Sequence, residues 1–171
     1  NNSNLKPAII FVHGGGWLKG NKQVHRAMAI DLAKQGFVTS AIEYRLGHEA
    51  AFPAGIQDCF ASVRFLRANS DKYHIDKTKI GVVGGSAGGH LAGLMATGHE
   101  NAKLTGTFGH TEESSKVQAA VVMAGPMEMT TGSVAERSKL AETNSNAYVW
   151  LEGTLSEKLD LYKLADAKLQ I

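Results

Sequence analysis

The sequence predicts an α/β fold in which a mostly parallel sheet carries helices on both faces. Short apolar runs rich in β-branched residues alternate along the chain with segments of helical period. A strand, a helix and a second strand in this order form a parallel βαβ unit, because the helix returns the chain to the same edge of the sheet. Because strands and helices alternate repeatedly along the chain, the sequence predicts an α/β fold class.

Four apolar runs are predicted to be the strands. Residues 7–12 are apolar, include β-branched residues and end at three consecutive glycines, as expected of a buried strand. The other three strands are predicted at residues 37–43, 79–83 and 117–124. The last of these runs is closed by Gly125 and Pro126, which cannot easily continue a strand.

The segments between the strands predict helices. Residues 21–35 and the segment that begins at Pro53 each carry one apolar stripe at helical spacing. The stripes consist of Val24, Ala27, Met28 and Leu32 in the first segment and of Ile56, Cys59, Phe60, Val63 and Leu66 in the second. Residues 88–97 are small and apolar on nearly every side, which predicts a fully buried helix. One more helix is predicted at residues 155–164.

Two stretches interrupt the alternation, and we expect both to be excursion loops of a single domain over residues 1–171. Residues 98–116 are polar and contain glycines and a short acidic run. Residues 127–151 have no regular period.

Composition excludes several classes of protein. With 43% apolar and 20% charged residues, the chain can bury a core, so it is neither disordered nor fibrous. The net charge is only +2 and no basic block exceeds two residues, which argues against a nucleic-acid partner. The apolar stretches are too short to span a bilayer. The single cysteine, Cys59, rules out an intramolecular disulfide and a cysteine-based metal site, and it is expected to be inert core. No feature indicates a cell compartment.

The segment Gly84-Gly85-Ser86-Ala87-Gly88 matches the pattern G-x-S-x-G between a predicted strand and a predicted helix. The glycines allow a turn tight enough to hold Ser86 in a strained conformation, with its hydroxyl above the sheet. The N-terminus of the following helix favours negative charge at that point. Ser86 is therefore the candidate nucleophile; the alternative is a glycine-rich turn with a surface serine.

A second motif, His13-Gly14-Gly15-Gly16-Trp17, leaves the end of the first predicted strand. Consecutive glycines let backbone N–H groups approach a ligand, and such donors stabilise the oxyanion of an acyl-transfer intermediate. The candidate donors are the amides of Gly14, Gly15 and Ala87. Candidates for the substrate pocket are His13, Gly16, Trp17, Gly85 and His90. Trp17 either forms a wall of that pocket or only supports the loop. The alternative for the whole motif is a structural one, in which the glycines form a tight turn packed under Trp17.

With both motifs in this order, the chain resembles the α/β-hydrolase fold and, within it, serine esterases with an HGGG oxyanion loop. Segments that support the resemblance are Glu43-Tyr44-Arg45-Leu46, Phe52-Pro53-Ala54 with Asp58, and the run from Ser86 to Ala92. Gly85 stands where hormone-sensitive-lipase-like carboxylesterases usually carry an acid. Together with His90, residues 117–121 and Gly125-Pro126, it makes the chain more similar to bifunctional feruloyl and acetyl-xylan esterases.

The resemblance implies hydrolysis of carboxylic esters through an acyl-enzyme on Ser86. The substrate would be a small-molecule ester, of a carbohydrate carrying acetyl or feruloyl groups or of a short acyl chain, and no metal or organic cofactor is implied. The strand at 8–12 would lie between those at 37–43 and 79–83, with the cleft where the strand order reverses. Two alternatives remain open: a silent domain that only binds ligand, and a peptidase or thioesterase on the same fold.

The general base is not evident. This fold orders its residues as nucleophile, acid, then histidine, and the histidines after Ser86 are His90, His99 and His110. His90 is expected to pack against the loop bearing His13 rather than to act as the base, and the other two are expected in loops. Asp166 is expected to be structural, since no apolar strand precedes it.

The resemblance therefore implies that the acid and the base lie on two further strands after Ile171, and that at least one strand precedes Asn1. The chain would then be a partial domain whose open sheet edges favour a homo-oligomer or aggregation. Arg45 and Asp58 are expected to form a buried pair that steadies the loops around the cleft.

Overall fold

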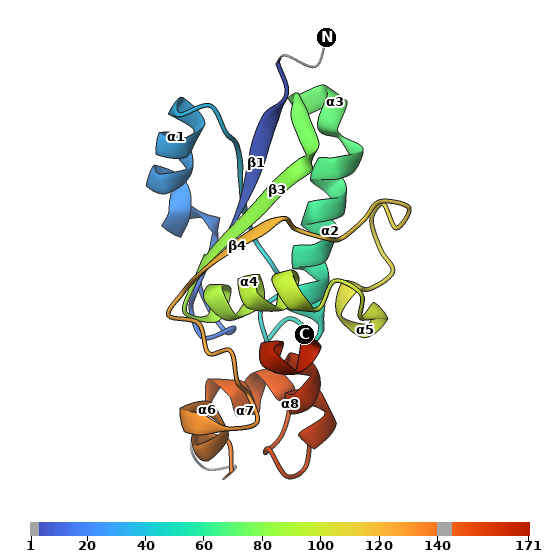
Figure 1. Ribbon diagram of the computed structural model, residues 1–171. Coiled ribbons are helices and arrows are strands. Elements are labelled where there is room, and N and C mark those ends of the chain that lie inside the picture. The colour runs from blue at the N-terminus through green and yellow to red at the C-terminus, as the bar shows by residue number, and fades with distance from the viewer. Residues whose placement is uncertain (1–3, 140–144) are drawn as a thin grey trace.

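The protein contains a four-stranded parallel sheet, seen in a computed structural model that describes residues 4–139 and 145–171. The strands are β1 (Lys6–Val12), β2 (Val38–Ile42), β3 (Ile75–Gly85) and β4 (Ala119–Met123). Their order across the sheet is β2-β1-β3-β4, and every neighbouring pair is parallel (Figure 1). The predicted fold class is confirmed, and so is the expected place of the first strand between the second and the third.

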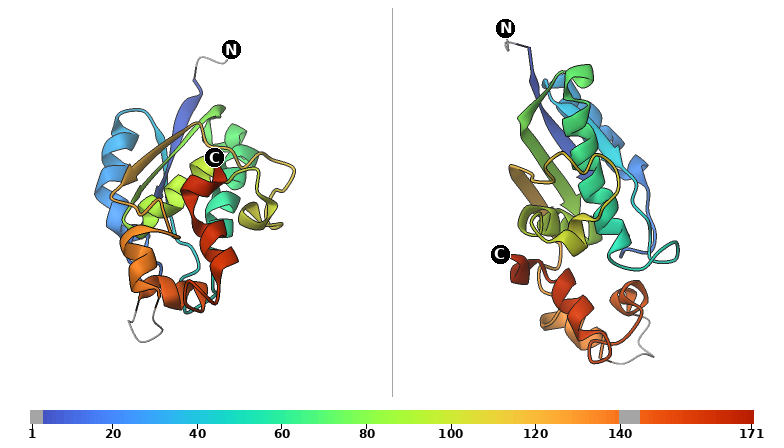
Figure 2. Two further views of the ribbon diagram at one scale, coloured as in Figure 1. Left: turned by 60° about the horizontal axis from the view of Figure 1, so that its bottom comes forward. Right: turned by 90° about the vertical axis from the view of Figure 1, so that its right-hand side faces the viewer.

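Helices lie on both sides of the sheet and at one end of it (Figure 1). The elements are η1 (Lys22–His25), α1 (Arg26–Lys34), α2 (Ala54–Ala68), α3 (Ser70–Tyr73), α4 (Ala87–Thr97), α5 (Ala102–Thr105), α6 (Gly132–Arg137), α7 (Asn146–Leu151), α8 (Leu159–Ala165) and η3 (Ala167–Gln170). Figure 2 shows that α6, α7 and α8 gather beyond the carboxyl ends of the strands, at the opposite end of the molecule from the N-terminus. No helix in the described ranges has the length and apolar character needed to cross a membrane.

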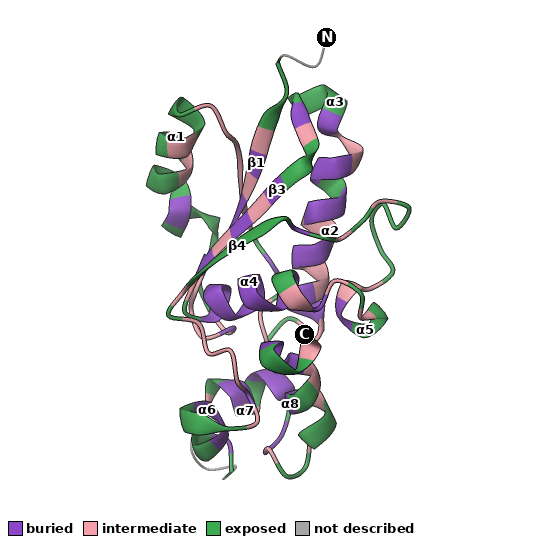
Figure 3. Ribbon diagram, viewed as in Figure 1, coloured by how far each residue is buried: buried purple, intermediate pink, exposed green. Residues whose placement is uncertain are grey.

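The core lies between the sheet and the pair α2 and α4. The predicted stripe of α2 is buried, with Ile56, Cys59, Phe60 and Val63 fully inaccessible. α4 is buried along nearly its whole length, as predicted for its small apolar residues (Figure 3). Burial raises the pKa of the Cys59 thiol, which fits the inert core role expected of it.

The predicted apolar face of residues 21–35 is wrong. Val24 is 66% exposed, Met28 is 41% exposed, and α1 buries none of its residues. The segment begins as the 3₁₀ helix η1, whose three residues per turn change the phase of the α-helix that follows. The buried side chain is instead that of His25, whose Nε2 donates a hydrogen bond to the Val12 carbonyl.

The two excursion stretches are more regular than predicted. Residues 98–116 contain α5, and residues 127–151 contain α6 and α7, although 140–144 lie outside the described residues. Helices of four to six residues are too short to show a period in sequence, and their stability comes from packing. Buried Val134, Ala147 and Trp150 provide that packing.

Two arginines of α2 hold the 98–116 stretch in place. Arg64 is 2% exposed and donates to the carbonyls of Thr105, Phe108 and Gly109 and to Ser115 Oγ. Arg67 donates to the carbonyls of Lys77, Ser114 and Lys116. Five guanidinium donors can serve several loop acceptors at once, so this long polar loop needs no hydrophobic core of its own.

The side of the sheet that faces α1 is only partly covered. β4 is exposed along its length, with Val121 at 52% and Val122 at 37% (Figure 3). A shallow apolar hollow of about 300 Å³ runs over β1, β3 and β4, lined by Ile9, Val83 and Ala119 among others.

We expect this surface to make the 171-residue chain self-associate. Replacing Val121, which lines this hollow, with threonine should weaken association about tenfold, because it removes buried apolar area while keeping a β-branched shape. Light scattering across a dilution series measures the effect. Val24→Thr on η1 is the matched control, and an equal effect of the control would contradict the assignment to the sheet.

Candidate active site

Ser86 lies at a sharp turn between β3 and α4. Its backbone has φ 50° and ψ −122°, a left-handed conformation that costs energy for a side chain, and its side chain is exposed. A Cβ at Gly84 would lie 2.0 Å from the Gly88 carbonyl oxygen, and one at Gly88 would lie 2.1 Å from that of Val12. The backbones at this turn therefore approach one another as only glycine permits, and the predicted strain at Ser86 is confirmed.

The glycine loop after β1 packs directly against this turn. A Cβ at Gly14 would lie 2.7 Å from the Gly85 carbonyl oxygen and 3.4 Å from Ser86 Cβ. Gly15 and Gly16 have φ values of 121° and 61°, so the loop uses conformations that favour glycine. Within the described ranges, the amides of Gly14, Gly15 and Ala87 donate no hydrogen bond to a protein acceptor. Three backbone donors without a protein acceptor among the described residues thus lie in the glycine loop and at the turn that holds Ser86.

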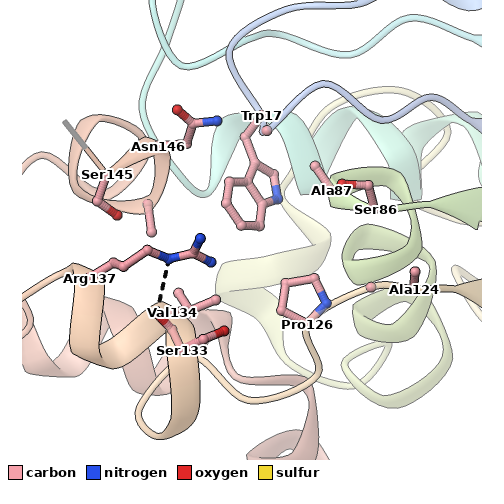
Figure 4. Close-up of a pocket in the computed structure, with 13 residues that line it drawn as sticks. Trp17, Ser86, Ala87, Ala124, Pro126, Ser133, Val134, Arg137, Ser145 and Asn146 are labelled. Atoms are coloured by element: carbon pink, nitrogen blue, oxygen red, sulfur yellow. Dashed lines mark hydrogen bonds between the residues drawn. The ribbon is translucent and has the colours of Figure 1, made fainter. Parts of the chain in front are cut away.

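A cleft of about 690 Å³ opens in front of Ser86. One side is formed by Gly16, Trp17, Ser86 and Ala87, and the floor by the chain that follows β4, as Figure 4 shows. The rest of the lining comes from α6 and from the start of α7, which contribute apolar Val134 and Ala147 and four polar residues. The polar residues are Ser133, Arg137, Ser145 and Asn146, and Asn146 lies against Gly16. Sequence reasoning missed these four residues because they lie in the stretch without a regular period, where no motif marks them.

Trp17 both walls the cleft and braces the loop. It lines the cleft but is only 6% exposed, and its ring stacks on Trp150 with centroids 4.9 Å apart and planes at 10°. Its indole Nε1 donates a hydrogen bond of 3.1 Å to His90 Nδ1. The two roles left open by the sequence are therefore compatible.

Three residues predicted to line the substrate pocket lie elsewhere. His13 is 1% exposed and stacks on Tyr44 at 4.4 Å, and its Nδ1 donates to the Gly14 carbonyl, so it borders a separate polar hollow. Gly85 faces β4, where a Cβ would contact Met123. His90 is fully buried beneath the cleft. The pleat of the strands and the turn of the helix direct these positions away from Ser86.

No histidine serves Ser86 in the described structure. All seven histidines are described, and none lines the cleft. His110 lies in the loop of residues 98–116 beside Glu112, with 3.3 Å between Nδ1 and Oε1, and His99 lies just after α4, as expected. The described residues also contain no group of three side chains suited to a metal ion.

Asp166 has a structural role, as the sequence predicts. It is 1% exposed, and its Oδ2 accepts hydrogen bonds from the amides of Met129 and Thr130 and from Thr130 Oγ1. This carboxylate fixes the chain that enters α6, and it does not line the cleft. Asp166 therefore stabilises the loop before α6 through these hydrogen bonds.

Arg45 and Asp58 form a bidentate ion pair, with Nη2 and Oδ1 2.8 Å apart. The side chains are 44% and 15% exposed, so the expected buried pair is half-open to solvent. The hydrogen bond to Asp58 raises the pKa of Arg45. The pair also holds the start of α2, because Arg45 Nη2 donates to the Ala54 carbonyl. The ion pair lines the same polar hollow as His13 and does not line the cleft in front of Ser86.

His90 is neutral at physiological pH. Burial lowers its pKa to about 4, against the opposing effects of its hydrogen bond to the Ala165 carbonyl and of the nearby Asp166 carboxylate. Its Nε2 lies 2.7 Å from that carbonyl oxygen. Since a carbonyl only accepts and an indole N–H only donates, the proton is on Nε2 and the lone pair is on Nδ1. Both ring nitrogens are engaged, so the imidazole cannot act as the base of Ser86.

The chain is similar to proteins that are named as esterases. The BD-FAE family profile matches residues 1–171. The chain is 32% identical over 137 residues to esterase LipC of Mycobacterium tuberculosis. This match covers 80% of this chain and 34% of LipC. The chain also spans only 28% of carboxylesterase NlhH of the same species, to which it is 38% identical over 92 residues. It thus spans about a third of the length of these relatives.

Two solved structures are similar over 99% of the chain. A bifunctional GH43-CE protein from Bacteroides eggerthii superposes with a TM-score of 0.87 at 30% identity, over 23% of its own length. A truncated form of a carbohydrate esterase from gut microbiota superposes with a TM-score of 0.84 at 28% identity, over 63% of its length.

The lowered pKa of His90 predicts a pH-dependent stability. The unfolded chain takes up a proton below its ordinary pKa near 6.5 and the folded chain only near 4, so stability falls as pH drops between these values. The loss from this group is on the order of 3 kcal/mol. Urea unfolding at pH 7 and pH 4.5 measures it. His90→Asn is the control: it does not titrate and should show a smaller pH difference, whereas an equal difference would contradict the assignment.

Proposed function

Because the chain belongs to the BD-FAE family, we propose that Ser86 is the nucleophile of a serine hydrolase acting on carboxylic esters. The observation that carries this proposal is the exposed, strained Ser86 together with three backbone amides that have no protein acceptor among the described residues. The relatives named as esterases support the same reaction class.

In this reaction, Ser86 Oγ attacks the carbonyl carbon of the ester, and the carbonyl oxygen becomes an anion in a tetrahedral intermediate. The amides of Gly14, Gly15 and Ala87 donate to that anion, and the N-terminal end of α4 adds a favourable dipole. The alcohol then leaves with a proton, and water releases the acyl group from Ser86. The donors are fixed before the reaction, so they need no reorganisation as the charge develops.

The substrate class we propose is an ester of a carbohydrate. One solved structure similar to this chain is named as a truncated form of a carbohydrate esterase, and another is named as a bifunctional GH43-CE protein. The part of the cleft formed by α6 and α7 carries hydroxyl, amide and guanidinium groups that can hydrogen-bond a sugar alcohol. Trp17 offers a flat apolar surface beside the nucleophile for the acyl group or for a sugar ring.

A histidine base and its acid complete this mechanism, and we assign both to segments beyond residue 171, as the family resemblance implies. One observation favours a second candidate function for the 171-residue chain alone. Since none of its histidines lines the cleft, it would bind an ester or sugar and turn it over only weakly.

Ser86→Ala in the intact protein should lower kcat/KM for p-nitrophenyl acetate by about 10⁴-fold or more, because no other group can form the acyl-enzyme. Initial rates measured by nitrophenolate release test this. Ser62→Ala on α2, away from the cleft, should leave the rate unchanged.

Retained activity in Ser86→Ala would exclude Ser86 as the nucleophile. The same assay on residues 1–171 separates the two candidate functions, because robust turnover that depends on Ser86 would exclude the ligand-binding domain.

A further inference from the structure

In the glycine loop of residues 13–17, the Gly15 carbonyl accepts hydrogen bonds from the amides of Leu18 and Lys19, and the His13 carbonyl accepts one from the Tyr44 hydroxyl, but none of these bonds reaches α4. Gly14, Gly15 and Gly16 carry no side chains, and two of them occupy left-handed conformations that glycine enters and leaves readily. An oxyanion hole nevertheless requires its donors to be held within a fraction of an ångström of the developing charge. The amides must therefore be fixed by contacts from outside the three glycines.

Trp17 is the residue through which such a contact is made. It directly follows the glycines and is itself in a left-handed conformation, with φ 62°. Its ring is held from two sides, by stacking on Trp150 and by an edge contact with His90 at 5.4 Å. Its carbonyl also accepts a hydrogen bond from the Gly47 amide at 2.9 Å. The indole N–H then adds a directional bond to His90 Nδ1.

His90 connects that bond to the nucleophile. It lies one turn after Ser86 in α4, and its amide donates to the Ser86 carbonyl at 3.0 Å. Its Nε2 donates to the Ala165 carbonyl at the end of α8, so the ring is fixed at both nitrogens. In the described structure, the Trp17–His90 bond is the only hydrogen bond that joins residues 13–17 to α4.

We propose that the hydrogen bond from Trp17 Nε1 to His90 Nδ1 sets the distance between the oxyanion donors and the nucleophile, which makes His90 a positioning residue. This inference rests on the proposed function of Ser86. It gives the fully buried imidazole a role in the reaction through Trp17, without contact with the substrate. Since the bond acts on the transition-state charge, its loss should lower kcat. Trp17 also lines the cleft, so only changes at the fully buried His90 should leave KM within about twofold.

The chain offers a matched pair of variants for the test. Trp17→Phe removes the N–H donor and keeps a ring for stacking. Trp150→Phe makes the same chemical change at an indole whose N–H has no partner among the described residues. Trp17→Phe should lower kcat about ten- to a hundredfold. Trp150→Phe reduces the stacking on Trp17 but removes no hydrogen bond, so it should lower kcat at least about threefold less than Trp17→Phe does.

A second pair changes the acceptor. His90→Asn retains an acceptor oxygen near the position of Nδ1, and His90→Leu fills the space without one. His90→Asn should keep kcat within about threefold and His90→Leu should lower it as Trp17→Phe does. Indole ¹H–¹⁵N spectra follow the bond directly: Trp17→Phe identifies the Trp17 signal, which His90→Leu should shift and His90→Asn should restore.

An unchanged kcat in Trp17→Phe, or an equal loss in His90→Asn and His90→Leu, would overturn the positioning role. If one variant does not fold, as judged by near-UV circular dichroism, the other pair decides. Activity that survives Ser86→Ala would overturn the proposed function itself. Activity that depends on Ser86 but is unaffected by Trp17→Phe would overturn only the inference about His90.

Discussion

The close approach of three backbones around Ser86 is the constraint on which the rest of the site depends. Gly84 and Gly88 allow the end of β3 and the start of α4 to meet within distances that any Cβ would prevent. Val12, at the end of β1, closes the same contact from the neighbouring strand. This contact turns Ser86 outward in a left-handed conformation, although the helix that follows is almost wholly buried.

The sheet order brings the glycine loop next to the turn at Ser86. β1 lies between β2 and β3, so the loop that leaves β1 and the turn that leaves β3 emerge side by side. The glycine loop therefore faces Ser86 across a short gap. The C-terminal helices cover the same end of the sheet and supply polar residues that line the cleft (Figures 1 and 4). The glycine loop, the turn at Ser86 and the C-terminal helices thus line one cleft.

Buried polar groups tie these separate parts together. His90 joins the glycine loop, α4 and the end of α8 through its two ring nitrogens. Asp166, the next residue after Ala165, holds the chain that enters α6. A buried polar group without partners is costly, so each of these side chains selects one arrangement of the elements around it. The C-terminal helices are therefore fixed by directional bonds to α4, the helix that follows Ser86.

The sequence by itself determined the α/β class, the strands, the buried α4 and the two glycine motifs, because each is a local pattern of period or spacing. The sequence wrongly predicted that Val24 belongs to a buried apolar face, whereas Val24 is exposed. It did not indicate that Arg137 and Asn146 line the cleft. It also named His13 and His90 as candidates for the substrate pocket, whereas both are buried and do not line the cleft. The expectation that His90 packs against the loop bearing His13 is confirmed by its contact with Trp17. Those features depend on contacts between segments far apart in the chain, such as the 73-residue separation of Trp17 and His90. Only the tertiary structure decides them, because local spacing does not say which partner a polar side chain will meet.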